Sequence, residues 1–272
     1  MEQPEDRIRK VAAYGKQVDF GKTASDYGRY RAGYPDELYR RLVSFGVGLL
    51  DQRILDLGAG TGFLGRGFAR NGCHLTASDI SMQLMREARR LDADASVVVD
   101  YTRAKAEALP FAGHTFDVVS AGQCWHWFDR YAAAAEACRV LRPGGRLVIA
   151  HFDWIPLPGN MAEATEKLIE KHNPKWKFGG GLGIHPQWPR DMAVAGFKNI
   201  ETFSFDIDAI YTHEAWRGRI RASAGVGASL APEAVAAFDV ELRAMLTERW
   251  PEDPMRVMHR VFAAIGVARN AL

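Results

Sequence analysis

The strongest constraint on how this chain can fold is a set of three alternating glycines after a short apolar segment. Residues 54–62 read ILDLGAGTG. The run over 53–57 predicts a buried strand, and the periodicity over 63–70 predicts a helix after the glycines. Because glycine lacks a Cβ, the loop can turn tightly and let a ligand approach its backbone. A plain turn without a ligand is the alternative, disfavoured because three glycines together lower stability.

Strands and helices continue to alternate up to residue 150. Apolar runs predict strands at 74–79, 97–99, 116–120 and 146–150, and helices are expected at 81–91, capped by Ser81, and at 131–141. This alternation implies a mostly parallel sheet with helices on both faces, that is, an α/β fold.

The flanking regions are more helical. Residues 1–50 are expected to form an N-terminal helical lid, with Pro35 in the first turn of a helix over 36–45. Residues 151–272 are expected to complete a seven-stranded sheet as part of the same domain. The elements predicted there are strands at 199–207 and 261–267, helices at 161–172, 212–224 and 232–249, and helical cap insertions at 155–190 and 211–255.

Composition excludes several classes of protein. The 272 residues include 35 basic and 33 acidic ones, so no bulk charge attracts nucleic acid or a membrane surface. No uncharged run approaches the ~20 apolar residues of a membrane helix, and the first ten residues do not resemble a secretory signal. Three cysteines without a C-x-x-C pattern argue against disulfides and zinc, which predicts a reduced, cytoplasmic protein.

The residues around the glycines indicate which ligand is expected. A dinucleotide loop needs a third glycine where this chain has Phe63, and no Gly-Lys-Ser/Thr follows for a phosphate loop. Asp79 ends the second predicted strand, where a carboxylate can accept hydrogen bonds from both hydroxyls of a ribose. Such bonds are worth roughly 1.5–3 kcal/mol. The site is therefore predicted to bind a nucleoside rather than a pyrophosphate.

Five segments in order resemble the class I S-adenosylmethionine-dependent methyltransferases, most closely the small-molecule type 11 group. They are LDLGAGTG at 55–62, Asp79, AEALPF at 106–111, FDVV at 116–119 and LRPGG at 141–145. The flanks at 27–35, 123–128 and 213–217 resemble trans-aconitate-type methyltransferases. The resemblance implies a Rossmann-like core at 51–150 that binds S-adenosylmethionine, with S-adenosylhomocysteine as product.

The same resemblance implies roles for individual residues. The glycine loop would face the methionyl part of the cofactor, Asp79 would hold the ribose, and Ile80 would lie against the adenine. Lys105 stands where an aspartate commonly receives the adenine amino group, so that contact stays open between Glu107 and backbone. The expected cofactor-binding residues are Tyr30, Gly58, Ala59, Gly60, Gly62, Asp79, Ile80, Ala106, Glu107 and Gln123.

Acceptor residues are expected at the carboxyl ends of the strands and in the lid. His126, in the loop after the fourth strand, is the candidate general base, with a structural histidine as the alternative. Arg217 and Arg221 share a helical face and form either a carboxylate clamp or a solvated surface. The expected acceptor-side residues are Tyr27, Arg31, Trp125, Trp154, Trp216 and Arg217.

These expectations predict methyl transfer to a small-molecule acceptor, on an oxygen of a carboxylate or hydroxyl. N-methylation is one alternative. Another is an NAD(P)-dependent oxidoreductase, since Tyr101 and Lys105 have the Tyr-x-x-x-Lys spacing. A regulator that binds the cofactor without catalysis is a third. No metal, nucleic-acid partner or membrane is expected, and the oligomeric state is left open.

Overall fold

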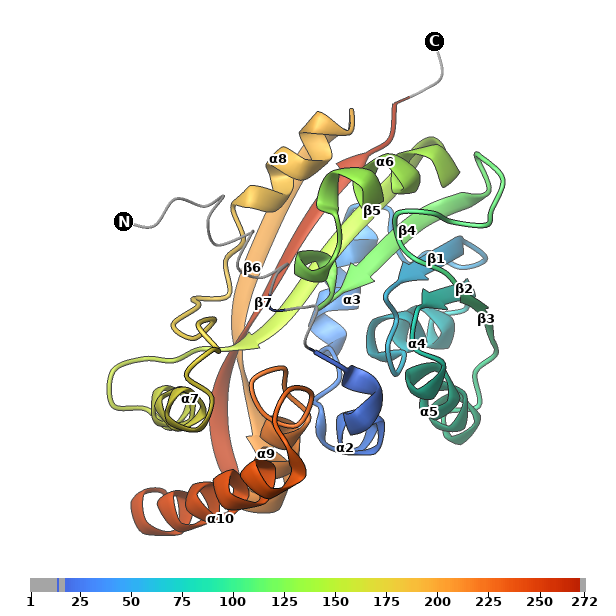
Figure 1. The fold of residues 1–272 in the computed structure, drawn as a ribbon. Coiled ribbons are helices and arrows are strands. Elements are labelled where there is room, and N and C mark those ends of the chain that lie inside the picture. The colour runs from blue at the N-terminus through green and yellow to red at the C-terminus, as the bar shows by residue number, and fades with distance from the viewer. Residues whose placement is uncertain (1–13, 15–17, 270–272) are drawn as a thin grey trace.

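In a computed structural model that describes Tyr14 and residues 18–269, seven strands form one sheet in the order β3-β2-β1-β4-β5-β7-β6 (Figure 1). Strands β1 to β5 pair in parallel, whereas β7 is antiparallel to both β5 and β6. The strands are β1 (Arg53–Leu57), β2 (His74–Asp79), β3 (Val99–Arg103), β4 (Phe116–Gly122), β5 (Leu141–Trp154), β6 (Lys198–Tyr211) and β7 (Met255–Val267). The predicted seven-stranded, mostly parallel Rossmann-like sheet is confirmed.

Helices cover both faces of this sheet, as the alternation predicts. Because side chains alternate along a strand, Ile54 contributes to the core on one face and Leu55 to the core on the other. Helices α3 (Asp36–Ser44) and α4 (Phe63–Arg70) pack on the first face, and α6 (Arg130–Val140) and α8 (Gln187–Val194) pack on the second. Helix α5 (Met82–Asp94) lies beside β2 and β3 (Figure 1). Ser81 caps α5 as predicted, since its hydroxyl accepts a hydrogen bond from Leu84 N.

A helical cap lies at the end of the three long strands. Helices α7 (Met161–His172), α9 (His213–Arg221) and α10 (Pro232–Arg249) gather there (Figure 1) and share a third apolar core with Trp216 and Phe238 at its centre. The predicted insertions therefore cap the sheet with these helices, while α8 returns to the sheet face. Among the described residues, no helix is both long and apolar enough to cross a bilayer.

Several predicted strand boundaries are corrected. The strands predicted at 146–150, 199–207 and 261–267 are longer, at Leu141–Trp154, Lys198–Tyr211 and Met255–Val267. The third strand was expected at 97–99 but begins at Val99, because Ser96 (φ +55°) and the bond from Val97 N to Asp92 O close the end of α5. The fifth strand continues well beyond residue 150, because β7 pairs with it as far as Trp154. Strand β4 ends earlier, at the pair Gly122–Ala150. Residues 151–154 of β5 therefore project past the end of β4.

The lid predicted over residues 1–50 is described only in part, since residues 1–13 and 15–17 lie outside the described residues. Its described portion contains η1 (Phe20–Thr23), α2 (Ala24–Tyr30) and α3. Pro35 is the N-cap of α3 instead of a residue in its first turn. Helix α2 packs between α5 and α9, next to the carboxyl ends of β1 and β2 (Figure 1).

Candidate active site

The glycine loop after β1 has a backbone that other residues adopt only with strain. Gly58, Gly60 and Gly62 have φ angles of +55°, +57° and +81°, in the left-handed region that favours glycine. A Cβ on Gly58 would lie 2.9 Å from Phe128, whereas a Cβ on Gly60 would meet no atom within 4 Å. The outer side of Gly60 is therefore open, and a ligand can reach the loop there.

Asp79, at the end of β2, holds this loop in place. Its Oδ2 accepts a hydrogen bond from Gly60 N at 2.8 Å, and its Oδ1 accepts one from Ser81 N at 2.8 Å. Burial raises the pKa of Asp79, and these backbone hydrogen bonds oppose the rise. Each carboxylate oxygen keeps a second lone pair, which suits a ribose diol. The next residue, Ile80, is 62% exposed and presents an apolar side chain beside this carboxylate.

The segment after β3 lies next to Asp79. Ala104 N donates a hydrogen bond to the backbone oxygen of Asp79 at 3.3 Å, which brings the predicted adenine-edge residues to this end of the sheet. Ala106 is buried. Glu107 is already engaged, because its Oε1 accepts a hydrogen bond from Asp129 N at 2.9 Å. Its second oxygen is left for the predicted contact with adenine.

Gln123 follows β4 in a left-handed conformation, with φ +63°. Its backbone N donates to Ala150 O at 2.9 Å, and its side-chain Nε2 donates to Phe152 O at 2.5 Å. Gln123 therefore joins the loop after β4 to the projecting end of β5. The structure brings the residues predicted at the glycine loop, at the end of β2 and after β4 to one edge of the sheet.

The described lid crosses this edge through aromatic contacts. The ring of Tyr27 lies 6.3 Å from that of Phe63 in α4, and the ring of Phe20 lies 5.8 Å from that of Trp127 in η2 (Trp125–Trp127). The η1–α2 segment therefore contacts both the helix after the glycine loop and the segment after β4. Tyr30, predicted to contact the cofactor, packs its ring against Gly218 of α9, and its contact with the cofactor stays a prediction.

Two of the predicted acceptor residues lie in the core. Trp125 and Trp216 are fully buried. The Trp125 indole donates to Asp191 and the Trp216 indole donates to Thr165, each at 3.1 Å. Their burial favours packing over contact with an acceptor. Trp154, at the end of β5, is only half-buried.

Arg217 is occupied by acidic neighbours. Its guanidinium pairs with Asp239 of α10 and, at 3.0 Å, with Glu214. Arg221 pairs with the same two carboxylates and also with Asp26 of α2 at 3.0 Å. The predicted pair of arginines therefore forms an ion-pair network that joins α2, α9 and α10, and its charge is already balanced.

His126 lies in η2, close to two other aromatic side chains. Its ring centre is 4.5 Å from that of Trp127 and 5.2 Å from that of His151. Burial, with a smaller contribution from His151, holds the pKa of His126 well below its ordinary range. His126 is therefore neutral at physiological pH, and no described residue hydrogen-bonds to it.

Sequence reasoning missed His151 and Asp153, which lie on the projecting end of β5. Asp153 Oδ2 is 3.3 Å from His151 Nδ1 and 3.0 Å from His185 Nε2. The two imidazoles hold the pKa of Asp153 well below its usual range despite burial. His151 Nε2 has no hydrogen-bond partner among the described residues. The pattern His-x-Asp directly after a strand was the available signal, hidden by ending that strand at residue 150.

His151, Asp153 and His185 place three donor atoms within 4.8 Å of one another. Imidazole nitrogens and a carboxylate are a donor set that several transition metals accept. Asp153 also pairs directly with both imidazoles without an ion, while His151 Nε2 keeps no partner among the described residues. That the site works without a metal stays a prediction.

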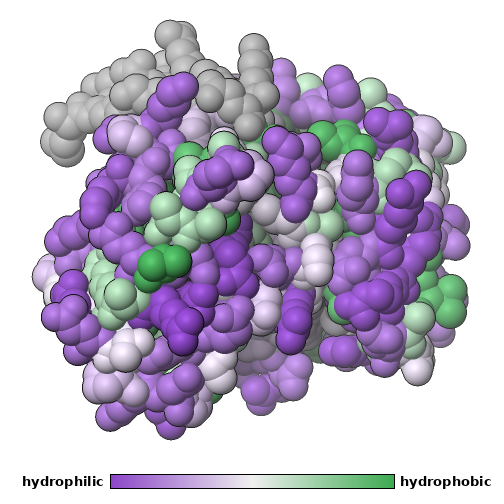
Figure 2. All heavy atoms as spheres, turned by 60° about the horizontal axis from the view of Figure 1, so that its bottom comes forward, coloured by the Kyte–Doolittle hydropathy of each residue, from purple (hydrophilic) through white to green (hydrophobic). Residues whose placement is uncertain are grey.

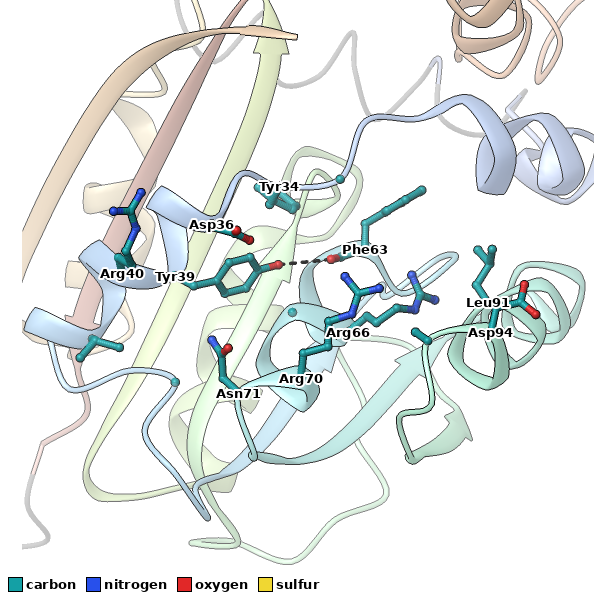
Figure 3. A pocket seen from close by; sticks show the side chains of 15 residues that line it. Tyr34, Asp36, Tyr39, Arg40, Phe63, Arg66, Arg70, Asn71, Leu91 and Asp94 are labelled. Carbon is teal, nitrogen blue, oxygen red and sulfur yellow. Dashed lines mark hydrogen bonds between the residues drawn. The ribbon is translucent and has the colours of Figure 1, made fainter. Parts of the chain in front are cut away.

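One cavity of the structure lies away from this site. It has a volume of about 650 Å³ and lies between α3, α4 and the end of α5, on the outer side of α4 (Figure 3). Its wall carries both charges, with Arg40, Arg70, Asp36 and Asp94 among the lining residues. It includes Phe63 but neither the glycines at 58–62 nor Asp79, so it does not offer the ribose contacts that the motif predicts.

The oxidoreductase alternative loses its structural support. The Tyr101 hydroxyl donates a hydrogen bond to Asp92 at 2.6 Å, and burial followed by that bond raises the pKa of Tyr101 far above its usual value. Lys105 is exposed in the loop after β3. A tyrosine held in this way cannot act as the acid that the Tyr-x-x-x-Lys pattern requires.

Comparisons with known proteins agree with this geometry. The methyltransferase domain family matches residues 55–149. The chain is 35% identical to the malonyl-[acyl-carrier protein] O-methyltransferase of Enterobacter lignolyticus, over 57% of this chain and 62% of that relative. It is 31% identical to the ubiquinone biosynthesis O-methyltransferase of Xanthomonas oryzae pv. oryzae, over 66% of this chain and 74% of that relative. The match thus spans less than two thirds of the length of the Enterobacter protein.

A solved structure shares the fold. A putative type II methyltransferase from Anaeromyxobacter dehalogenans superposes with a TM-score of 0.63 at 23% identity, over 89% of this chain and all of that one. At this identity the likeness concerns the fold alone.

Proposed function

Because the chain belongs to the class I S-adenosylmethionine-dependent methyltransferases, we propose that it transfers a methyl group to an oxygen atom of a small-molecule acceptor. The observation that carries the proposal is the open backbone of Gly60 beside the hydrogen-bonding carboxylate of Asp79. The two relatives described above are O-methyltransferases, which supports oxygen over nitrogen as the methylated atom.

The residues at the strand ends fit the proposed cofactor. Asp79 would accept hydrogen bonds from the ribose hydroxyls, Ile80 would cover the adenine, and the backbone at Gly60 would lie against the methionyl group. S-adenosylmethionine supplies an activated methyl group when bound, so the protein's task is to orient the acceptor and exclude water. The lid formed by η1 and α2 would exclude water.

An acceptor hydroxyl must lose its proton. His126 was the expected base, but His151 is the better candidate, because Asp153 faces its Nδ1 and leaves Nε2 without a partner. A carboxylate beside one ring nitrogen sets the tautomer and makes the other nitrogen a hydrogen-bond acceptor. We therefore assign proton removal to His151 Nε2, with Asp153 orienting the ring; burial lowers the pKa of His151 to about 4, so the ring is neutral at physiological pH and is a weaker base than a free imidazole. A carboxylate acceptor would need no base.

The proposal is tested by ligand binding and by turnover. S-adenosylhomocysteine at about one hundred times its Kd should stabilise the protein by about 2.7 kcal/mol, and NAD should not. Asp79→Ala should weaken binding by roughly 1–3 kcal/mol, measured by calorimetry. Methylated product should then appear from metabolite pools with labelled cofactor. Binding of S-adenosylhomocysteine without any product would leave a non-catalytic regulator.

A cytoplasmic location, a small-molecule partner, and the absence of nucleic-acid, membrane and metal partners are proposals that follow from the family and the charge balance. So is the likeness of segments 27–35, 123–128 and 213–217 to trans-aconitate-type methyltransferases. The mostly hydrophilic face in Figure 2, with only scattered apolar side chains, is consistent with a small-molecule partner.

A further inference from the structure

Arg219 of α9 is a buried cation for which the described part of the chain offers no carboxylate at ion-pair distance. The residue is 8% exposed, and its guanidinium lies 4.8 Å from the ring centre of Trp154. Two other buried arginines are paired, Arg66 with Asp92 and Arg130 with Asp191. An unpaired buried charge destabilises the folded state, so its presence points to a partner that arrives from outside the chain.

A buried tyrosine lies beside Arg219. Tyr211 is 3% exposed, and its hydroxyl makes no hydrogen bond of normal length and angle among the described residues, although the Ala32 backbone and the Arg219 side chain lie close enough to lower its pKa by hydrogen bonding. The two groups act on each other, since the charge of Arg219 opposes the rise that burial causes in the pKa of Tyr211. Burial and the nearby charge of Arg31 lower the pKa of Arg219 to about 10, which still leaves it charged at neutral pH.

The basic side chains near Trp154 favour an anion. Besides burial, Arg31 lowers the pKa of Arg219 as a neighbouring positive charge. The nearby carboxylates are engaged elsewhere: Asp153 with two histidines, and Glu166 with the Trp154 indole and Gly180 N. Arginine binds carboxylates through paired hydrogen bonds, and a tyrosine hydroxyl can donate a third.

We infer that Arg219 and Tyr211 form a subsite for a carboxylate of the acceptor, and that this carboxylate is not the oxygen that receives the methyl group. The inference rests on the proposed methyl transfer and names its substrate class, a small hydroxy acid or phenolic acid.

The separation of the two groups follows from the strand. Neighbouring side chains of β5 point to opposite sides of the sheet. Trp154, whose ring contacts the guanidinium of Arg219, therefore points to the side opposite His151 and Asp153. An oxygen beside His151 Nε2 is therefore not the oxygen that Arg219 holds. Because β5 projects past the last pair of β4 at Ala150, its edge beyond that residue is not covered by β4. Gln123 Nε2 and the Tyr34 hydroxyl bond to Phe152 O and Ala150 O along this edge, so the inference requires the acceptor to reach past these side chains to both sides.

One experiment tests the unpaired charge without any ligand. Arg219→Met should raise the melting temperature of the ligand-free protein by about 2–4 °C, because it removes a buried charge that has no partner. Arg130→Met is the matched control: that arginine is equally buried but paired, so its loss should lower the melting temperature. A fall for Arg219→Met as large as that for Arg130→Met would mean that Arg219 is satisfied within the chain and would overturn the inference.

A second experiment tests the ligand class, using protein saturated with S-adenosylhomocysteine. Benzoate should raise the melting temperature and benzamide should not, and Arg219→Met and Tyr211→Phe should reduce or abolish the response while Arg130→Met keeps it. An equal response to benzoate and benzamide, or an undiminished response in Arg219→Met, would overturn the subsite. A response to inorganic phosphate alone would overturn its assignment to a carboxylate. Failure of S-adenosylhomocysteine itself to bind would instead defeat the proposed methyl transfer.

Discussion

At the scale of single residues, the polar groups of this protein divide into those that the chain satisfies and those that it leaves open. Arg217 and Arg221 are balanced by Asp239 and Glu214, so they hold helices together. Arg219 on the same helix, and the Nε2 of His151, have no such partners within the described part of the chain. Buried groups without partners lower stability, which is why they mark the region where an acceptor would bind.

The prediction at this scale distinguishes the roles of His126 and His151. His151→Ala should lower kcat by about 10²–10⁴-fold if it removes the acceptor proton, whereas His126→Ala should lower it only modestly. Affinity for S-adenosylhomocysteine, measured by calorimetry, should be unchanged in both variants. Asp153→Asn should also lower kcat, because it no longer orients the His151 ring as a carboxylate does. A larger loss in His126→Ala than in His151→Ala would restore His126 as the base.

At the scale of elements, the position of α2 depends on two glycines. A Cβ on Gly28 would lie 2.7 Å from Glu87 of α5, and one on Gly218 would lie 2.1 Å from the ring of Tyr30. Because these two glycines have no Cβ atom, α2 fits between α5 and α9. The ion pair of Asp26 with Arg221 stabilises this position. The placement of the lid is therefore a property of the helix that it packs against.

Gly218→Ala should displace α2 without unfolding the sheet. The added methyl group should destabilise the protein by about 1–3 kcal/mol and increase hydrogen exchange in residues 24–30. It should also weaken the binding of S-adenosylhomocysteine, because the lid no longer covers the glycine loop. Gly181→Ala is the control, since a Cβ there meets no atom within 4 Å. Unchanged exchange in α2 would show that its packing on α9 does not position the lid.

At the scale of the whole molecule, the long strands β5, β6 and β7 bury histidines between the sheet and the cap. His259 of β7 is 2% exposed, and burial is the main cause that lowers its pKa to about 4. Arg219 and Arg31 lower this pKa further, while Asp153 and the hydrogen bond with Val257 O oppose the shift. Folding therefore favours the neutral form of this side chain.

Stability should fall in mildly acidic solution. An unfolded histidine has a pKa of about 6.5, so between pH 6.5 and 4 the unfolded chain binds more protons than the folded one. The free energy of unfolding should therefore decrease as the pH drops through this window. His259→Asn should flatten the decrease by up to about 3 kcal/mol at pH 4, measured by urea unfolding. His74→Asn, at an exposed site, should leave the slope as it is; the same slope in both variants would contradict this account.

The parts of the fold and of the candidate site that local sequence signals predicted are those whose causes are local. The glycines at 58–62 adopt positive φ angles, Asp79 is the last residue of β2, and Ser81 caps the helix that follows it. Each of these features depends on residues within a few positions of it in the chain. Periodicity likewise placed α7 and α10 at their observed bounds. The cofactor side could therefore be predicted from the sequence.

Long-range pairing decided the rest. Val97 and Val98 have strong strand propensity, yet the C-terminal turn of α5 takes up Val97 and leaves Val98 outside the strand. The projecting end of β5 exists because β7, a hundred residues later in the chain, pairs with it. Three arginines of α9 look alike in sequence. Asp26 and Asp239, which lie on other helices, form ion pairs with Arg217 and Arg221 but not with Arg219. Spacing along a helix fixes which face a side chain occupies, but the charge that meets it there comes from distant segments that only the tertiary structure brings into place.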